Sequence, residues 1–287
     1  MKRINPVTKL IKDVESFANN MPVSQQVKFG HKFIQPLEWL SDPVLLGLEN
    51  IPDDKPVLFV GNHTLMGLLD STVMWFQLYH QKGIFTHVLA DHIHTKIPIW
   101  NSLIKMYGAT EGTRENCGEL MRQGKHVLVF PGGVREVFKN KGEKYKLIWK
   151  KRLGFARMAI EHSYTIIPFA AVGAEECYDI IYDNKQIQKT PVGKLLKAWG
   201  VREDILFPIV KGFGATLLPK PQRFYYKFGN PISTTQYEGD YKNDINAKDL
   251  KARVKFFVEE GIEELLAFRA DDPKRNFANR LFSKIIK

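Results

Sequence analysis

The period of apolar and polar positions changes several times along the chain. Short runs rich in Val, Ile and Phe, typical of buried strands, occur at 57–61, 84–91, 126–130 and 165–173. Between and around them, apolar residues recur at helical spacing over 68–81, 97–108, 113–124 and 150–163. Strands that alternate with helices are typical of parallel sheets. We therefore predict an α/β fold with a mixed, largely parallel sheet flanked by helices.

The two ends of the chain have mostly helical patterns. Residues 5–50 predict helices, and we expect residues 1–45 to form an N-terminal helical, membrane-associating extension ahead of one domain over 46–287. A late strand is predicted within 223–233, followed by a strong amphipathic helix over 246–270. Residues 175–222 are less regular, and we expect them to pass over the sheet as an excursion.

Composition and charge narrow the class of protein. Apolar residues make up 44% of the 287 residues, which is enough to bury a large core. A net charge of +11 favours anionic partners such as nucleic acid, an anionic membrane surface or phosphorylated ligands. The two cysteines, Cys117 and Cys177, lie far apart, which argues against a disulfide framework and a cysteine-rich zinc site and fits a reducing compartment.

A histidine follows the first buried strand. His63 comes two residues after Gly61, and α/β sheets usually bind ligands at the carboxyl ends of their strands. An imidazole there can accept a proton near neutral pH, and a carboxylate within reach would fix its tautomer. Asp70 is the nearest candidate. From this stretch alone, a histidine that caps a helix or bonds a loop carbonyl is the simpler interpretation.

Three further motifs follow in order. In FPGGVRE, residues 130–136, paired glycines let the backbone approach an anion, and Arg135 offers a planar fork for phosphate or carboxylate. GATEGTR, residues 108–114, ends in Arg114 near a predicted helix start. TIIPFAAVG, residues 165–173, carries a proline inside an apolar run. Taken singly, these motifs have simpler interpretations: a tight turn with a surface arginine, a solvated arginine, and a kinked or edge strand.

Taken together, the motifs resemble those of the glycerolipid and lysophospholipid acyltransferase superfamily. Its members carry a histidine-plus-aspartate block after the first strand, then a glycine-to-arginine block, an FPEGTR-type block and an apolar block ending in proline. GNHTLMGLLD, GATEGTR, FPGGVRE and TIIPFAAVG match these blocks in order and rough spacing, over about residues 45–175. GLENIP before the first strand and FGNPIS late in the chain also look like the family.

Two departures from the family pattern stand out. The family usually has four residues between histidine and aspartate, but position 68 is Leu and the aspartate comes later, at Asp70. Either Asp70 serves in a longer loop, or another group orients His63. The second departure is Gly132 where the common block has glutamate, with Val134 in place of threonine. FPGGVRE looks more like the branch with plant phytyl ester synthases and diacylglycerol acyltransferases, whose acceptors include neutral alcohols.

The resemblance implies an O-acyltransferase. It would move a fatty acyl group from an acyl thioester, acyl-CoA or acyl carrier protein, to a hydroxyl of a lipid acceptor, with His63 as general base. Backbone N–H groups of the glycine pair would stabilise the oxyanion. The implied site residues are two catalytic groups, His63 and Asp70, and five substrate-binding groups, Arg114, Gly132, Gly133, Arg135 and Glu136. No cofactor and no metal ion are implied.

A lipid substrate changes the interpretation of the basic segment Lys139–Arg152. Its lysines and arginines alternate with aromatic and aliphatic residues, and basic residues gain about 1 kcal/mol each near anionic lipid. We expect this segment to face an anionic membrane surface, with the N-terminal helices and the basic tail over 276–287 adding apolar contacts. We find no signal peptide and no run approaching the roughly 18–20 apolar residues of a spanning helix. We therefore expect a cytoplasmic protein, peripheral to the inner face of a membrane.

Two other functions remain open on sequence grounds. An esterase or thioesterase would use the same His63 with water as acceptor, and the sequence barely separates it from a transferase. A basic nucleic-acid-binding protein is disfavoured because no helix-turn-helix, zinc finger or aromatic-glycine RNA motif occurs. We therefore expect no nucleic-acid partner. His92 and His94 could share a strand face, but two histidines without a third ligand are a weak indication of a metal site.

Overall fold

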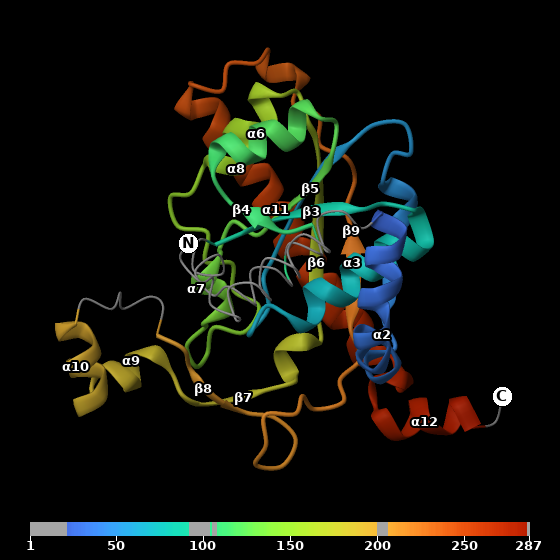
Figure 1. Ribbon diagram of the computed structural model, residues 1–287, viewed down its shortest axis with the longest axis vertical. Helices are drawn as coiled ribbons and strands as arrows, with labels where there is room; N and C mark the ends of the chain where they lie inside the picture. Colours follow the sequence, from blue (N-terminus) through green and yellow to red (C-terminus); the bar gives the residue numbers. More distant parts are fainter. Residues whose placement is uncertain (1–21, 92–103, 105–107, 200–205, 286–287) are drawn as a thin grey trace, which may run out of the picture.

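A seven-stranded sheet forms the centre of the computed structural model, which describes residues 22–91, 104, 108–199 and 206–285 (Figure 1). Its strand order is β1-β9-β6-β2-β5-β3-β4. The strands are β1 Val44–Leu46, β2 Val57–Gly61, β3 Thr86–Ala90, β4 Thr110–Glu111, β5 His126–Val129, β6 Thr165–Val172 and β9 Tyr225–Phe228. The block from β6 to β4 is parallel throughout, while β9 runs antiparallel to β6 and parallel to β1. The predicted mixed, largely parallel sheet is confirmed.

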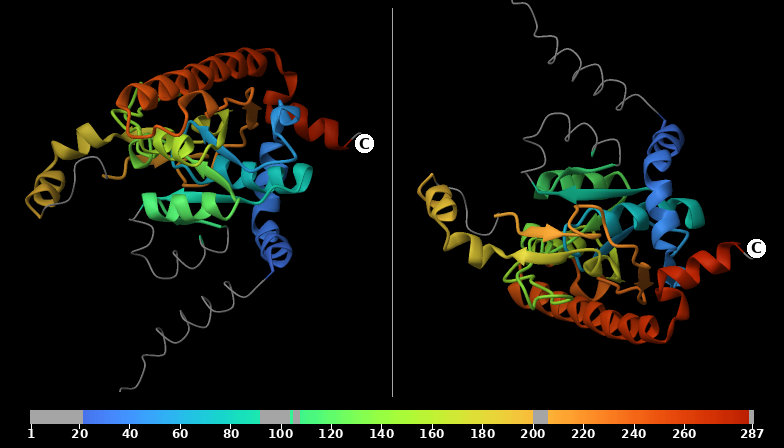
Figure 2. Two further views of the ribbon diagram at one scale, coloured as in Figure 1. Left: turned by 90° about the horizontal axis from the view of Figure 1, so that it is seen from above. Right: turned by 90° about the horizontal axis from the view of Figure 1, so that it is seen from below.

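Helices cover both faces of this sheet. Helices α8 and α11 pack on one face, and α3 with α2 lies on the other (Figure 2). The helices are α2 Val23–Ser41, α3 Leu69–Lys82, α6 Arg114–Arg122, α7 Val134–Val137, α8 Gly154–Glu161, α9 Asn184–Gln188, α10 Pro191–Ala198, α11 Asp244–Asp271 and α12 Phe277–Ile285. Short 3-10 turns cover Leu48–Asn50, Ala174–Glu176, Thr235–Tyr237 and Pro273–Arg275.

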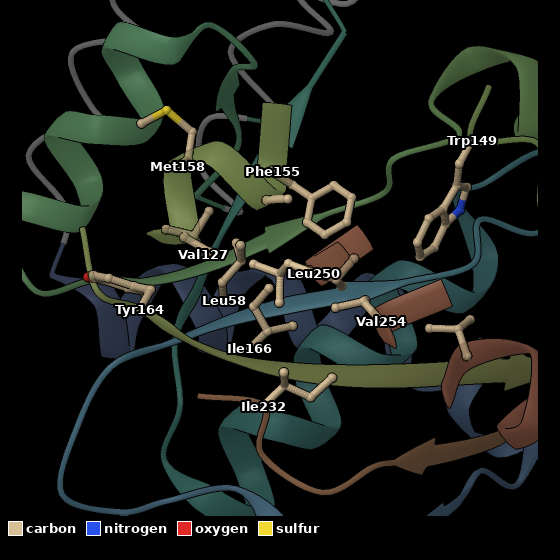
Figure 3. Close-up of a cluster of buried hydrophobic side chains, with 14 of the residues drawn as sticks. Leu58, Val127, Trp149, Phe155, Met158, Tyr164, Ile166, Ile232, Leu250 and Val254 are labelled. Atoms are coloured by element: carbon tan, nitrogen blue, oxygen red, sulfur yellow. The ribbon is translucent and has the colours of Figure 1, made fainter. Parts of the chain in front are cut away.

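Strand β2 shows why the sheet strands are almost continuously apolar. All five of its residues are buried because each face of the strand lies under a helical layer. Leu58 points into the cluster with Ile166 of β6 and Leu250 of α11, which Figure 3 shows from close by. Phe59 points the other way, into the cluster beneath α3. A core on both faces fixes the position of the loop that follows β2.

The carboxyl ends of the parallel strands lie along one edge of the sheet. The loops after β2, β5 and β6 therefore meet there. From the end of β6 the chain runs into an excursion that contains β7 Asp179–Tyr182, α9, α10 and β8 Ile209–Lys211, and it returns at the start of the antiparallel β9. We call the described residues 177–199 and 206–222 the arm. Helices α9 and α10 of the arm project away from the sheet (Figures 1 and 2), whereas Tyr178 and Val210 at its base pack into the buried cluster with Phe169 of β6.

The N-terminal region differs from the prediction at one place. The described helix α2 ends at Ser41, and the expected helical segment then becomes strand β1, which pairs with β9. Helix α2 packs along α3 with Val27 buried, so it is tied to the sheet layer. Residues 1–21, His92, His94 and most of the helix predicted over 97–108 lie outside the described residues. Within the described ranges, no helix has the length and apolar character needed to cross a membrane.

Candidate active site

The loop that carries His63 is fixed to the sheet by the residue before it. Regular pairing between β2 and β6 reaches Gly61 opposite Phe169. The buried Asn62 side chain then bonds both backbone groups of Ala171, donating to its carbonyl at 2.9 Å and accepting from its N–H at 2.8 Å. One side-chain amide thus replaces a backbone ladder step and sets the direction in which the chain leaves β2.

The His63 imidazole lies between an aromatic ring and a tight turn. It stacks on Phe130, the first residue of FPGGVRE, with 3.9 Å between ring centroids and an interplanar angle of 9°. On the other side is Gly67, where an added Cβ would lie 2.6 Å from Cε1 and 2.8 Å from Nε2 of the ring. The positive φ of Gly67, 60°, also favours glycine. The glycine turn therefore makes room for the edge of the imidazole that carries Nε2.

Buried ionisable side chains hold the backbone of His63. Its N–H donates to the Glu136 carboxylate at 3.0 Å, and its carbonyl accepts from Lys139 Nζ at 3.1 Å. Lys139 also forms an ion pair with Glu175, and all three ionisable side chains are almost completely buried. The second Glu136 oxygen accepts from the Ile148 N–H at 2.6 Å. The position of His63 therefore depends on contacts that span three separate segments.

Burial raises the pKa of each carboxyl group in this cluster. Burial raises the pKa of Glu136 and of Glu175, and the Lys139 charge acts against that rise in both. Burial also raises the pKa of Asp70 from 3.8 to about 6, with a smaller contribution from the charge of Glu175. Three buried carboxyl groups thus accompany a single buried lysine. Such an arrangement of perturbed carboxyl groups is typical of functional sites.

Asp70 lies in the first turn of α3, fully inside the protein. The Tyr226 hydroxyl donates to its backbone carbonyl at 2.9 Å, which ties this turn to β9. The N-terminal end of a helix favours a carboxylate, and this partly offsets the cost of burying one. The proposed orientation of His63 by Asp70 stays a prediction.

The structure explains why each residue of the glycine pair in FPGGVRE is a glycine. Gly133 adopts φ 51° and ψ −148°, a region essentially restricted to glycine, and its N–H donates to the Phe130 carbonyl at 3.0 Å. A Cβ at Gly132 would overlap the Glu136 carboxylate. Position 132 is the one at which the common family block has glutamate. In this protein Glu136 fills the space into which a side chain at position 132 would project.

The three predicted substrate-binding side chains differ in their surroundings in the structure. Glu136 is fully buried with both carboxylate oxygens bonded to backbone N–H groups, so it holds the loop instead of facing a substrate. Arg135 donates to both oxygens of Glu143 at 2.7 Å and to the Phe138 carbonyl at 3.2 Å, which occupies its fork. Arg114 is exposed at the first residue of α6, after β4, at the same sheet edge but three strands from β2.

The basic segment Lys139–Arg152 is not the exposed amphipathic patch that its sequence suggested. Lys139 is buried in the ion pair with Glu175, and Trp149 is only 1% exposed within the core beside Phe155 (Figure 3). Its aromatic residues therefore pack inward, because the segment closes over the cluster that holds His63. The exposed lysines that remain do not carry an apolar membrane face with them.

Sequence reasoning missed three residues that position the histidine. Asn62 had a local signal, a polar amide directly after a buried strand. Lys139 was hidden within a charge run that is usually solvated, and Glu175 lies 36 residues further along the chain. No spacing rule connects such partners, because the sheet brings them together. Among the described residues, no group of three or more His, Cys, Asp or Glu side chains could hold a metal ion.

Comparison with known proteins gives a family match across these motifs. Residues 44–172 match the family model described as Acyltransferase. Phytyl ester synthase 1, chloroplastic, of Arabidopsis thaliana is 35% identical over 255 residues, which cover 83% of this chain and 36% of that protein. The human DGAT1/2-independent enzyme synthesizing storage lipids is 29% identical over 221 residues, covering 76% of this chain and 60% of the relative. The chain thus spans about a third to three-fifths of the length of these relatives.

A solved structure shares the fold. The crystal structure of the 1-acyl-sn-glycerophosphate acyltransferase PlsC from Thermotoga maritima superposes with a TM-score of 0.52 at 19% identity, covering 89% of this chain and 88% of that one. At this identity the likeness concerns the arrangement of the sheet and its helices.

Proposed function

We propose that this protein is an O-acyltransferase acting at a membrane surface, because residues 44–172 match the family model described as Acyltransferase. It transfers a fatty acyl group from an acyl thioester to a hydroxyl of a glycerolipid or a lipid alcohol. The observation that carries this proposal is His63, held at the carboxyl end of β2 by buried ionisable partners and stacked on the Phe130 ring. One relative is named a phytyl ester synthase, and a phytyl ester is an ester of a lipid alcohol. This name supports a lipid alcohol as the class of acceptor.

The proposed reaction needs one proton acceptor. His63 Nε2 takes the proton of the acceptor hydroxyl as its oxygen attacks the thioester carbonyl carbon, forming the new C–O bond. The tetrahedral intermediate then collapses, the C–S bond breaks, and the leaving thiolate takes the proton from the imidazolium. The stacked Phe130 ring and the backbone contacts hold the imidazole in place, so little reorganisation is needed as the proton moves.

The surrounding charges suit the imidazolium that forms during the reaction. With a pKa of about 6, the buried Asp70 is largely ionised at pH 7.5. Negative charge in a water-poor setting stabilises a cation far more than it would in water. We assign Asp70 the role of orienting His63 and stabilising its protonated form.

The oxyanion requires a donor on the glycine turn. The Gly133 N–H already donates to the Phe130 carbonyl, so we assign the role of oxyanion donor to the Gly132 N–H. Gly133 contributes by allowing the turn. Arg114, exposed at the same edge, is the arginine assigned to an anionic group of donor or acceptor, whereas Arg135 holds the turn through Glu143.

An acyl-transfer assay tests the function. Purified protein would be given labelled acyl-CoA or acyl carrier protein thioester, with liposomes containing lysophosphatidate, a lysophospholipid, diacylglycerol or a long-chain alcohol. We expect label in the ester of one acceptor class, matched by release of an equal amount of thiol, and neither product from His63→Ala. Label found only in free fatty acid would instead identify a thioesterase. Absence of ester with every donor and acceptor would contradict the proposal.

A further inference from the structure

The arm concentrates exposed apolar side chains. Its described residues, 177–199 and 206–222, carry ten of the 21 large apolar side chains that are exposed in the described part of the chain. The most exposed of them are Trp199, Leu217, Leu218, Val192 and Phe213, each more than 60% accessible. Soluble monomers rarely expose so much apolar surface in one region, and such regions usually contact a partner or a membrane.

The apolar tips of the arm are presented by an ordered turn. In the loop after β8, the Gly212 N–H donates to the Thr216 carbonyl and the Phe213 N–H donates to the Leu218 carbonyl, both at 2.7 Å. These bonds close the loop on itself while leaving Phe213, Leu217 and Leu218 outward. The exposure is therefore a property of the folded arm.

The charge of the arm is net positive. Its residues contain six lysines and two aspartates, and the sequence between its two ranges, 200–205, adds one arginine, one aspartate and one glutamate. Asp183 is buried as the N-cap of α9, and Asp179 forms an ion pair with Lys220. The other lysines are exposed among the apolar side chains, as on Lys189 and Lys194 at either side of the start of α10. Lysines interleaved with exposed apolar groups match an anionic lipid surface in both charge and chemistry.

The arm also adjoins the candidate active site. It leaves the sheet at the carboxyl end of β6, the edge at which His63 lies, and Phe207 of the arm packs edge-on against Phe138 directly after α7, with 4.8 Å between centroids. In Figure 1 the arm lies along the lower border of the molecule, and α12 lies at the other end of that border. Helix α12 exposes Phe282 and Ile285. A flat surface beneath the molecule would meet both elements.

We propose that the arm is the surface by which this protein docks on an anionic lipid bilayer. Its apolar tips enter the interfacial layer, its lysines contact the headgroups, and the carboxyl edge of the sheet then faces the lipid. The identity of the lipid as substrate rests on the proposed acyltransferase function, whereas the docking itself does not.

Vesicle co-sedimentation tests the docking. The full chain would be mixed with phosphatidylcholine vesicles with and without phosphatidylglycerol, comparing wild type with the triple variant Trp199→Ser, Leu217→Ser and Leu218→Ser. The matched control is Ile245→Ser with Phe256→Ser, two exposed apolar residues of α11, outside the arm. We expect the arm variant to lose at least about tenfold in partitioning and the control to match wild type. Equal binding by wild type and the arm variant would overturn the proposal, as would an equal loss in the control.

A charge variant separates lipid docking from general stickiness. Lys189→Gln with Lys194→Gln should weaken binding to phosphatidylglycerol vesicles by about fivefold per lysine and leave phosphatidylcholine binding unchanged. Light scattering in the absence of lipid tests the alternative that the arm binds a second copy of the chain. A wild-type dimer that the arm variant converts to monomer, with vesicle binding retained, would assign the arm to a second copy of the chain and overturn the proposal.

Activity distinguishes the two proposals from each other. With a short-chain acyl thioester and acceptor that stay dissolved, the arm variants should turn over at the wild-type rate, and with vesicle-borne acceptor they should be slower by the loss in binding. If neither the wild type nor the arm variants transfer acyl groups but vesicle binding still requires the arm, the proposed function is wrong and the docking proposal is supported.

Discussion

Replacing Asp70 by asparagine should stabilise the protein while lowering its activity. Burial raises the pKa of Asp70 from 3.8 to about 6, so the folded protein holds this proton more tightly than the unfolded chain does. Ionising the carboxyl group therefore costs folding free energy. The cost is absent below the unfolded pKa, develops as pH rises from 3.8 to about 6, and is constant above that range.

The size of the effect follows from the shift. A difference of about two pKa units at 1.36 kcal/mol each corresponds to about 3 kcal/mol at pH 7.5 and about 1 kcal/mol at pH 4.5. The amide of the variant cannot ionise, so Asp70→Asn should gain stability over wild type by about these amounts. Activity should fall at least about tenfold, because the neutral amide no longer stabilises the imidazolium.

Urea unfolding at the two pH values measures the difference. The matched control is Asp271→Asn, an exposed carboxylate at the end of α11, whose effect on stability should be small at both pH values. A stability difference between wild type and Asp70→Asn that does not grow between pH 4.5 and 7.5 would refute the reasoning. Full activity in the variant would remove Asp70 from the proposed mechanism.

Two further substitutions test how His63 is held. Lys139→Met leaves the buried Glu175 without its ion-pair partner and should cost about 3–5 kcal/mol in unfolding free energy, most of which Lys139→Met combined with Glu175→Leu should restore, as measured by urea titration. Gly67→Ala places a methyl group against the His63 ring at a positive φ, so we expect a loss of about 1–2 kcal/mol in stability and about a hundredfold in turnover. Unchanged turnover in Gly67→Ala would contradict the role of this glycine in making room for the imidazole.

Local periodicity predicted the elements whose character is set within their own sequence. Strands β2, β5 and β6 are buried on both faces and have continuous apolar runs, and the amphipathic pattern over 246–270 became α11. Strand β1 could not be found this way. Its three residues are only half-buried, and its partner β9 lies about 180 residues later, so the pairing depends on the finished sheet.

The residues of the site that lie in local motifs were predictable from the sequence, and the residues that support them from distant segments were not. The motif order indicated His63 and the glycine turn, and the structure brings both to one sheet edge, where the His63 ring stacks on Phe130. The supports were not predictable, because Lys139 lies in a charge run that is usually solvated. The fork of Arg135 was expected to bind a substrate anion, but Glu143, eight residues on, occupies it. Burial and long-range pairing, absent from local sequence, decide such roles.

The rate of acyl transfer by His63→Gln tests the central claim most directly. The measurement compares thiol release and ester formation in wild type, His63→Gln and His162→Gln, a control at the end of α8 beside the opposite edge of the sheet, with thermal melting to verify folding. We expect His63→Gln to lose at least about a hundredfold in rate while melting like wild type, and His162→Gln to keep its activity. A folded His63→Gln protein that transfers acyl groups at the wild-type rate would contradict the assignment of His63 as the general base.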